Sequence, residues 1–149
     1  SVTAWVFAKE YRTYRELTYE MRSADKYGYT KDQFVERGYV VLSVSAMERE
    51  ERQKHNRNIL DTFSGKVGKG EKAALNIVFW TVEGRPVFRH FYFNGRSWRY
   101  VFDQSRDGFS DMKIERSVCK GGRIPEQAGA EPIVELTDCK TYRSEIFVY

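Results

Sequence analysis

The sequence lacks several features that would place it in a class at once. No apolar run in its 149 residues approaches the roughly 18 that a membrane-spanning helix needs. No basic stretch leading into an apolar one follows Ser1, so we expect no secretory leader within the residues given, with a signal peptide or anchor removed upstream as the alternative. We therefore expect a soluble protein, with membrane attachment made only through an anchor removed upstream.

Sequence motifs of enzymes are also scarce. The stretch 64-SGKVGKGEKA-73 lacks the spacing of a phosphate-binding loop, so we expect a solvated loop there. His55 and His90 are the only histidines, and no GxSxG motif accompanies either of them. We expect a packed His90 beside Arg99 and no catalysis. The alternative is a hydrolase of a cell-envelope polymer, with His90 or a carboxylate of residues 103–111 as its base.

The chain has two cysteines, Cys119 and Cys139. Neither lies in a CxxC motif or near a histidine, so a metal site or a catalytic thiol is disfavoured. A disulfide between them would stabilise the fold by about 3 kcal/mol and favours an extracytoplasmic location. The alternative is a pair of buried free thiols in a cytosolic protein.

Charge is mixed along the chain. There are 25 basic and 21 acidic residues, and 41% of the chain is hydrophobic, including ten Tyr, ten Phe and three Trp. In 47-MEREERQKHNR-57, opposite charges recur four residues apart, which is typical of a solvated helix face. We expect a globular domain that binds no nucleic acid.

Local signals predict two helices and a strand between residues 30 and 63. Thr30 with Gln33, and Ser45 with Glu48, have the spacing of capping boxes. They predict a short helix closed by Gly38, a strand over 39–44, and a longer helix that carries Ile59, Leu60 and Phe63 toward a core. The first 28 residues fit both a helical stripe and a strand alternation, and we favour a helix.

The remaining chain is typical of strands. Three antiparallel strands are predicted over 74–82, 86–93 and 97–102, followed by strands over 113–118, 133–136 and 144–149 and a polar loop over 120–132. These elements predict an α+β fold, in which an antiparallel meander sheet of about five or six strands packs on one long helix. We expect a single domain over 29–149, with residues 1–28 as an accessory segment.

The hairpin signals place an arginine among aromatic residues. A two-residue turn at Asn94-Gly95 would set Phe91 opposite Trp98 and Arg89 opposite Tyr100. A similar turn at Glu83-Gly84 would add Trp80 to the same face. Arginine with several aromatics can hold a planar anion or a saccharide, so these five residues are our candidate ligand-binding site. The alternative is a core face with Arg89 reaching out at its rim.

The stretch 103-DQSRDGFSD-111 resembles a calcium loop. Asp103, Ser105, Asp107 and Asp111 have suitable spacing, but the twelfth position of an EF-hand loop needs a carboxylate and is Ile114 here. A polar turn is therefore the simpler interpretation, and no cofactor is expected. A calcium-stabilised structural domain is the alternative.

Several of these signals together resemble a known family. The motifs are 81-TVEGRP-86, 102-FDQSRDGF-109 and the two cysteines, within a similarity over about residues 29–149. They resemble a small domain family of unknown function that occurs in secreted and lipoprotein-type proteins of Gram-positive bacilli. Two departures are Arg37-Gly38-Tyr39, where such domains more often have an Asn-Gly-Asp turn, and the lack of a lipobox cysteine. The resemblance implies an extracytoplasmic location and a disulfide, but no activity.

Together these observations predict an extracytoplasmic binding or interaction module of a bacterial cell envelope, either secreted or anchored at the cell surface. Its partner would be an envelope component or another protein.

Overall fold

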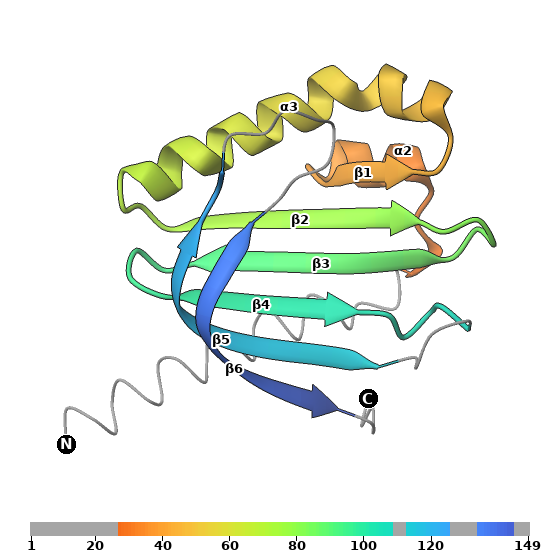
Figure 1. Cartoon of the computed structure of the whole chain (residues 1–149). Coiled ribbons are helices and arrows are strands. Elements are labelled where there is room, and N and C mark those ends of the chain that lie inside the picture. The colour runs from red at the N-terminus through yellow and green to blue at the C-terminus, as the bar shows by residue number, and fades with distance from the viewer. Residues whose placement is uncertain (1–26, 109–112, 126–133, 145–149) are drawn as a thin grey trace. The chain divides into compact units, whose positions relative to one another are not determined.

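A computed structural model describes residues 27–108, 113–125 and 134–144 (Figure 1). The helices and strands that it describes belong to one compact unit, residues 30–147. The predicted helix within residues 1–28 and the greater part of the predicted strand over 144–149 lie outside the described residues.

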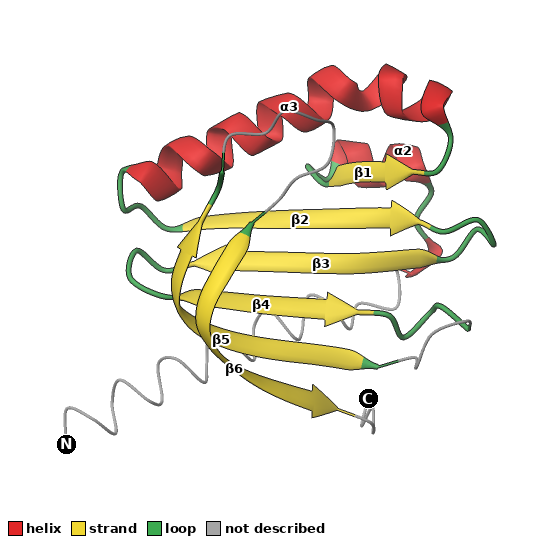
Figure 2. Ribbon diagram, in the orientation of Figure 1, coloured by secondary structure: helices red, strands yellow, loops and turns green. Residues whose placement is uncertain are grey.

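Six strands form one sheet in the order β1-β2-β3-β4-β5-β6 (Figure 2). β1 and β2 pair in parallel and all other neighbours are antiparallel, which confirms an α+β fold with a mostly antiparallel sheet. An all-antiparallel sheet was wrong, because the chain leaves β1, passes through α3 and returns as β2 in the same direction. The elements are α2 (Lys31–Glu36), β1 (Val40–Ser43), α3 (Ala46–Gly68), β2 (Ala73–Trp80), β3 (Pro86–Phe93), β4 (Trp98–Asp103), β5 (Ile114–Arg123) and β6 (Glu135–Ser144).

The predicted helix starts are confirmed. Thr30 and Gln33 form a complete capping box at α2, and the Ser45 side chain accepts a hydrogen bond from the Glu48 N–H at α3. The Glu48 carboxylate accepts two hydrogen bonds from Lys31, at 2.9 and 3.0 Å, instead of completing a second box. The hydrogen bond from Lys31 lowers the pKa of Glu48. The sequence signal was right about the helix start and wrong about the partner of this carboxylate.

Helix α3 continues five residues past Phe63, so the prediction of a loop from residue 64 was wrong. Val67 lies one turn after Phe63 and packs against the same core, which extends the apolar stripe of the helix. The helix ends only where Gly70 adopts a left-handed φ of 71° and donates to the Val67 carbonyl.

Longer loops than predicted connect β2, β3 and β4. Between β3 and β4 the Asn94 side chain accepts hydrogen bonds from the N–H groups of Arg96 and Ser97, which closes a four-residue loop. Between β2 and β3 the Thr81 N–H donates to the Arg85 carbonyl across a five-residue loop. The first loop shifts the predicted pairing by two residues. The loop between β2 and β3 shifts the predicted pairing of these two strands by one residue. The β2 side chains, such as Trp80, therefore lie on the face opposite to the one predicted.

One face of the sheet carries the main hydrophobic cluster, to which α3 contributes Phe63. The Phe63 and Trp98 rings lie 5.9 Å apart in an edge-on contact. The buried members are Val40, Leu42, Phe63, Ala73, Leu75, Ile77, Phe91, Phe93, Trp98 and Cys119. We call this side of the sheet the cluster face.

The last hairpin is much longer than the sequence predicted. β5 and β6 pair over ten residues each, so residues 120–123 belong to a strand and not to a loop. The end of this hairpin turns toward α3 (Figure 1), where Ile124, Val134 and Leu136 pack against the cluster. A Cβ on Gly122 would lie 2.5 Å from the Trp98 ring, so glycine is needed for this close approach. Glycine weakens a strand pattern, which explains why the sequence signal was missed.

Candidate binding surface

The structure separates the five residues predicted to bind a ligand. Phe91 and Trp98 are buried in the hydrophobic cluster, with exposed fractions of 6% and 2%. Trp80 pairs with Pro86 and lies on the opposite face, near Phe34 of α2. Arg89 is exposed and Tyr100 is half-buried, and both remain on the cluster face. The prediction of a shared face was therefore wrong for Trp80, because the loop before β3 is longer than a two-residue turn.

Arg89 lies against an aromatic ring that the sequence did not identify. Its guanidinium carbon is 5.2 Å from the centre of the Phe102 ring, a cation–π contact. The pairing places Arg89 opposite Phe102 and Phe102 opposite Glu115, so the three residues form a row across β3, β4 and β5. Phe102 was missed as the neighbour of Arg89 because the predicted register was two residues out.

Tyr100 extends this aromatic surface toward the core. Its ring stacks on Phe91 at 4.6 Å and is nearly parallel to Phe102 at 6.4 Å. Burial raises the pKa of Tyr100 to about 12, and the negative charge of Glu115 adds to the effect, whereas Arg89 opposes it. At neutral pH Tyr100 is a neutral hydroxyl donor, as it would be with its ordinary pKa of 10.0, and it lies next to the permanent positive charge of Arg89.

Arg89 is the positively charged residue of this row. Within the described ranges, no carboxylate lies within ion-pair distance, 4.0 Å, of Arg89. Its planar fork can bind a carboxylate through two hydrogen bonds while Phe102 holds it from below. We define the open part of the cluster face, Arg89, Tyr100, Phe102 and Glu115, as the Arg89 surface.

His90 lies on the face opposite the Arg89 surface and is 3% exposed. Its Nδ1 is 2.8 Å from the Asn76 side-chain oxygen, and its ring stacks on Phe88 at 5.9 Å. His90 is paired with Val101, and not with Arg99 as predicted. These contacts describe a packed histidine, whereas a general base needs access to a substrate.

The Asp103 loop is held by its own hydrogen bonds. One Asp103 oxygen accepts from the Ser105 backbone at 2.9 Å and from the Ser105 hydroxyl at 2.6 Å, and Asp103 is fully buried. The Asp107 N–H donates to the Gln104 carbonyl. Asp111 lies outside the described residues. In the part of the chain that is described, no group of three or more His, Cys, Asp or Glu side chains could hold a metal ion.

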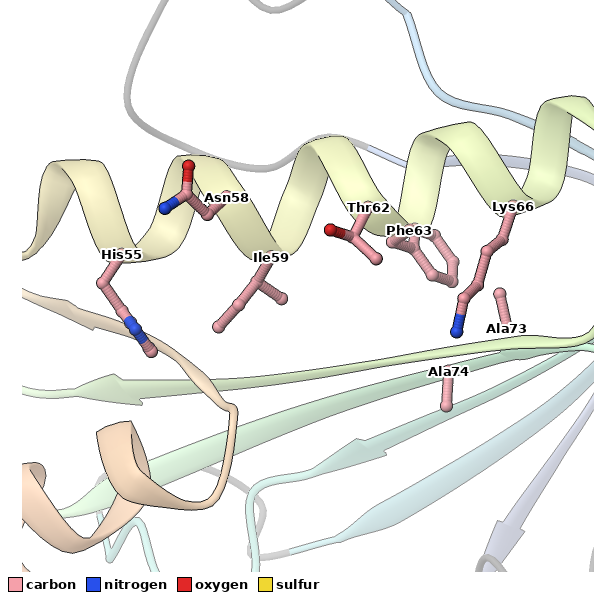
Figure 3. A pocket seen from close by; sticks show the side chains of 8 residues that line it. All are labelled: His55, Asn58, Ile59, Thr62, Phe63, Lys66, Ala73 and Ala74. Carbon is pink, nitrogen blue, oxygen red and sulfur yellow. The ribbon is translucent and has the colours of Figure 1, made fainter.

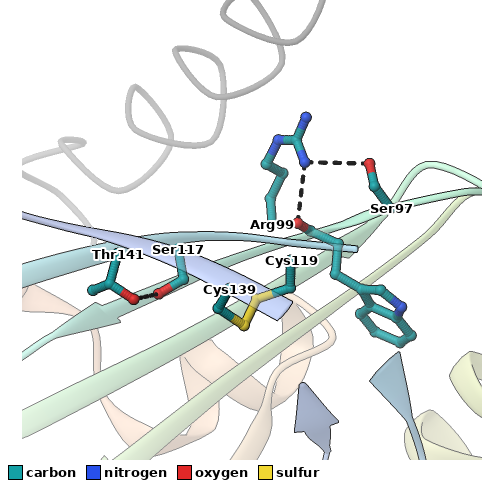
Figure 4. Close-up of a disulfide and its surroundings, with 7 residues drawn as sticks. Ser97, Arg99, Ser117, Cys119, Cys139 and Thr141 are labelled. Atoms are coloured by element: carbon teal, nitrogen blue, oxygen red, sulfur yellow. Dashed lines mark hydrogen bonds between the residues drawn. A yellow bond between two sulfur atoms is a disulfide. The ribbon is translucent and has the colours of Figure 1, made fainter. Parts of the chain in front are cut away.

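Cys119 and Cys139 form a disulfide between β5 and β6, as predicted (Figure 4). Cys119 is buried in the hydrophobic cluster and Cys139 is exposed. The next pair on the same face of the hairpin, Ser117 and Thr141, shares a hydroxyl hydrogen bond of 2.8 Å. On β4, Arg99 bonds the Ser97 hydroxyl and the Trp98 carbonyl. The disulfide thus ties β6 to the strand beside the core.

A pocket of about 290 Å³ lies between α3 and the start of β2 (Figure 3). β1 pairs only with residues 77–80 of β2, so the earlier part of β2 has no strand neighbour on that side. The Lys66 side chain reaches down from α3 toward this segment. The residues that line the pocket are His55, Asn58, Ile59, Thr62, Phe63, Lys66, Ala73 and Ala74. His55 is already bonded to the Tyr39 carbonyl at 2.9 Å. This pocket is a concave place, separate from the Arg89 surface, where a small ligand could lie.

Among the described residues, no helix is long and apolar enough to cross a membrane.

Fold and surface together define an α+β domain in which an exposed arginine lies beside half-buried aromatic rings on one face of the sheet. The chain belongs to the family of DUF4362, a domain of unknown function, whose model matches residues 51–130. This match confirms the resemblance to a domain of unknown function. It includes the whole Arg89 surface and Cys119, whereas Cys139 lies outside it. The chain matches no curated protein and no solved structure significantly.

Proposed function

We propose that this protein is a non-catalytic binding module that holds a carboxylated saccharide on the Arg89 surface. The observation that carries the proposal is the exposed Arg89 guanidinium lying over Phe102, with no carboxylate in ion-pair distance among the described residues. A salt bridge to another residue of the domain would explain an arginine on a sheet face, and the described part of the chain gives Arg89 none.

The chemistry of the surface favours a sugar acid. Arg89 can donate two hydrogen bonds to a carboxylate, and the rings of Phe102 and Tyr100 offer flat apolar area to a sugar ring. The Tyr100 hydroxyl, which is protonated at neutral pH, can donate to a sugar oxygen. Glu115 adds an acceptor for a sugar hydroxyl at the next strand. A planar aromatic carboxylate could bind to Arg89 and stack on the rings, but it has no hydroxyl groups to bond to Tyr100 and Glu115.

The binding test is calorimetric titration with oligogalacturonate, a saccharide that carries one carboxylate on each ring. Arg89→Gln should weaken binding by about 10- to 100-fold, the value of a charge-assisted hydrogen bond pair. Arg96→Gln is the matched control, because Arg96 is also exposed but lies in the loop at the far end of β3. Neutral cello-oligosaccharides should bind more weakly than oligogalacturonate. Equal weakening by both arginine variants would refute a specific role for Arg89.

We also propose an extracytoplasmic location in a bacterial envelope. The disulfide supports it, because such bonds persist in oxidising compartments and are rare in a reducing cytosol. The sequence resemblance to secreted and lipoprotein-type proteins of Gram-positive bacilli points the same way. Protein taken from its own cells and treated with a thiol-alkylating reagent before reduction should gain no label. Labelling of both cysteines would place the protein in a reducing compartment.

Two alternatives have less support in the described residues. A hydrolase with His90 as its base would need that buried ring to be accessible. A calcium-stabilised domain would need Asp103 to give up its bonds to Ser105, or to share them with an ion. Thermal unfolding with and without calcium tests the second alternative, because an ion that binds the folded state raises the midpoint.

A further inference from the structure

The two edges of the sheet differ in how they are closed. At the β1 edge, the Asn56 side chain of α3 donates to the Val41 carbonyl and accepts from the Val41 N–H, both at 3.0 Å. The helix thus takes the place of a further strand. β6 forms the other edge, and its residues 137–141 are exposed. An uncovered strand edge can pair with another strand.

The backbone of β6 has its pairing groups directed outward at alternate residues. Cys119 and Cys139 have a Cα–Cα distance of 4.0 Å, which is typical of a pair that does not exchange backbone hydrogen bonds. The N–H and C=O groups of Cys139 therefore point away from β5, and the same holds for Thr141 by alternation, whereas the left-handed φ of Asp138 interrupts the alternation before Thr137. Within the described ranges, no hydrogen bond to these outward groups is found.

The sequence of β6 is complementary to itself when it is read in the opposite direction. If Cys139 stands opposite Cys139 of a second antiparallel copy, acidic residues meet basic ones and threonine meets threonine. Among the described side chains, the pairs beside Cys139 are Thr137 with Thr141 and Asp138 with Lys140. Opposite charges directly across two strands stabilise the pairing, and each pair occurs twice because of the symmetry.

We propose that β6 is a self-association edge, at which a second copy of this chain pairs antiparallel about Cys139. The outward groups of Cys139 would exchange two hydrogen bonds across the two-fold axis. Asp138 has a left-handed φ of 54°, which limits regular pairing on that side to the residues next to Cys139, and the Asp138–Lys140 pairs supply its charge complementarity. At the opposite edge of the sheet, Asn56 occupies the outward groups of Val41, and α3 lies beside the start of β2.

The symmetry has a consequence for binding, which rests on the proposed function of the Arg89 surface. A two-fold axis that joins two antiparallel edge strands runs perpendicular to the sheet, so both cluster faces look the same way. Two Arg89 surfaces would then meet one polymer from the same side, which raises the overall affinity without new contacts. The pairing itself does not depend on any ligand.

The first test is sedimentation equilibrium of the full chain in the absence of ligand. We expect a reversible, concentration-dependent species of twice the chain mass of 17.6 kDa. Lys140→Asp replaces two attractive pairs with two repulsive ones and should raise the dissociation constant at least about tenfold. Lys54→Asp, the same charge change on an exposed position of α3, should leave it unchanged. A wild-type chain that stays monomeric at all concentrations, or equal effects of both variants, would overturn the proposal.

A second test uses the wild-type chain alone. A carbodiimide joins carboxylates to amines in direct contact, and a mixture of isotopically labelled and unlabelled chains distinguishes links between copies from links within one. We expect a link from Asp138 of one copy to Lys140 of the other. Links between copies that involve other segments and not β6 would contradict the proposal. Neither test measures saccharide binding, so failure here leaves the proposed function to its own titration.

Discussion

Asn56 shows how one side chain replaces a strand. Its amide supplies both a donor and an acceptor to Val41 at the β1 edge, in a site that is 95% buried. From the helical pattern of the sequence alone, an apolar residue would be expected at this buried position of α3. An asparagine is explained by the position of β1 at the edge of the sheet. β1 pairs with β2 on one side, so the Val41 N–H and C=O groups on its other side face α3 and need partners.

We predict that Asn56→Ala lowers the free energy of unfolding by about 2–4 kcal/mol, because it leaves a buried N–H and a buried C=O unpaired. The control is Asn58→Ala, an exposed position two residues away on α3, which should change stability by less than about 0.5 kcal/mol. Urea unfolding followed by circular dichroism measures both. Equal small losses would mean that water replaces the amide without cost.

Tyr100 gives a pH-dependent signature of the Arg89 surface. Its pKa of about 12 in the folded state lies above the usual 10.0, so the folded state holds this proton more tightly than the unfolded state. The corresponding stability is fully present below pH 10 and is lost as the pH rises toward 12. The phenolate absorbance of the wild type and of Tyr100→Phe can be measured as the pH is raised. The difference between the two curves, which reports Tyr100 alone, should have its midpoint near pH 12.

Arg89→Gln should raise this Tyr100 midpoint further, because the positive charge of Arg89 favours the phenolate. A Tyr100 midpoint near 10, or one that falls in Arg89→Gln, would show that the ring and the guanidinium do not share this surface.

At the scale of helices and strands, local sequence signals predicted where helices start better than where strands end and how strands pair. The caps at Thr30 and Ser45 were found because a cap needs only nearby residues. The register across Asn94–Ser97 was wrong by two, since Asn94 closes a longer loop with its side chain. The β5–β6 hairpin was cut short because Gly121 and Gly122 look like loop residues, although contact with Thr137 and Trp98 requires them. Such contacts lie far apart in sequence and leave no local pattern.

The hairpin is the element in which the disulfide acts. The bond closes a loop with a sequence separation of 20, so reduction should lower the free energy of unfolding by about 3 kcal/mol. Guanidinium unfolding of the wild type with and without reductant measures the difference. Cys119→Ala with Cys139→Ser should reproduce the reduced state and then show no response to reductant. An unchanged midpoint on reduction would mean that β6 is held by its pairing with β5 alone.

At the scale of the whole molecule, composition and pattern predicted the α+β class, the long helix and the disulfide. They did not predict the parallel strand pair, which depends on the chain returning through α3. Of the candidate site, Arg89 and Tyr100 remain together on an accessible surface, whereas Phe91 and Trp98 are core residues. Phe102 joins them only once the true register is known. A sequence pattern can place residues on one face, but it cannot tell which part of that face a helix and a curled hairpin will cover.

The central claim is that the ligand binds to the Arg89 surface and not in the pocket between α3 and β2. The most direct measurement is a titration of isotopically labelled protein with oligogalacturonate, followed by amide chemical shifts. We predict that the shifts concentrate at Arg89, Tyr100, Phe102 and Glu115 and disappear in Arg89→Gln. Shifts confined to Lys66 and Ala74 would assign the ligand to the pocket beneath α3 and would contradict the proposed function.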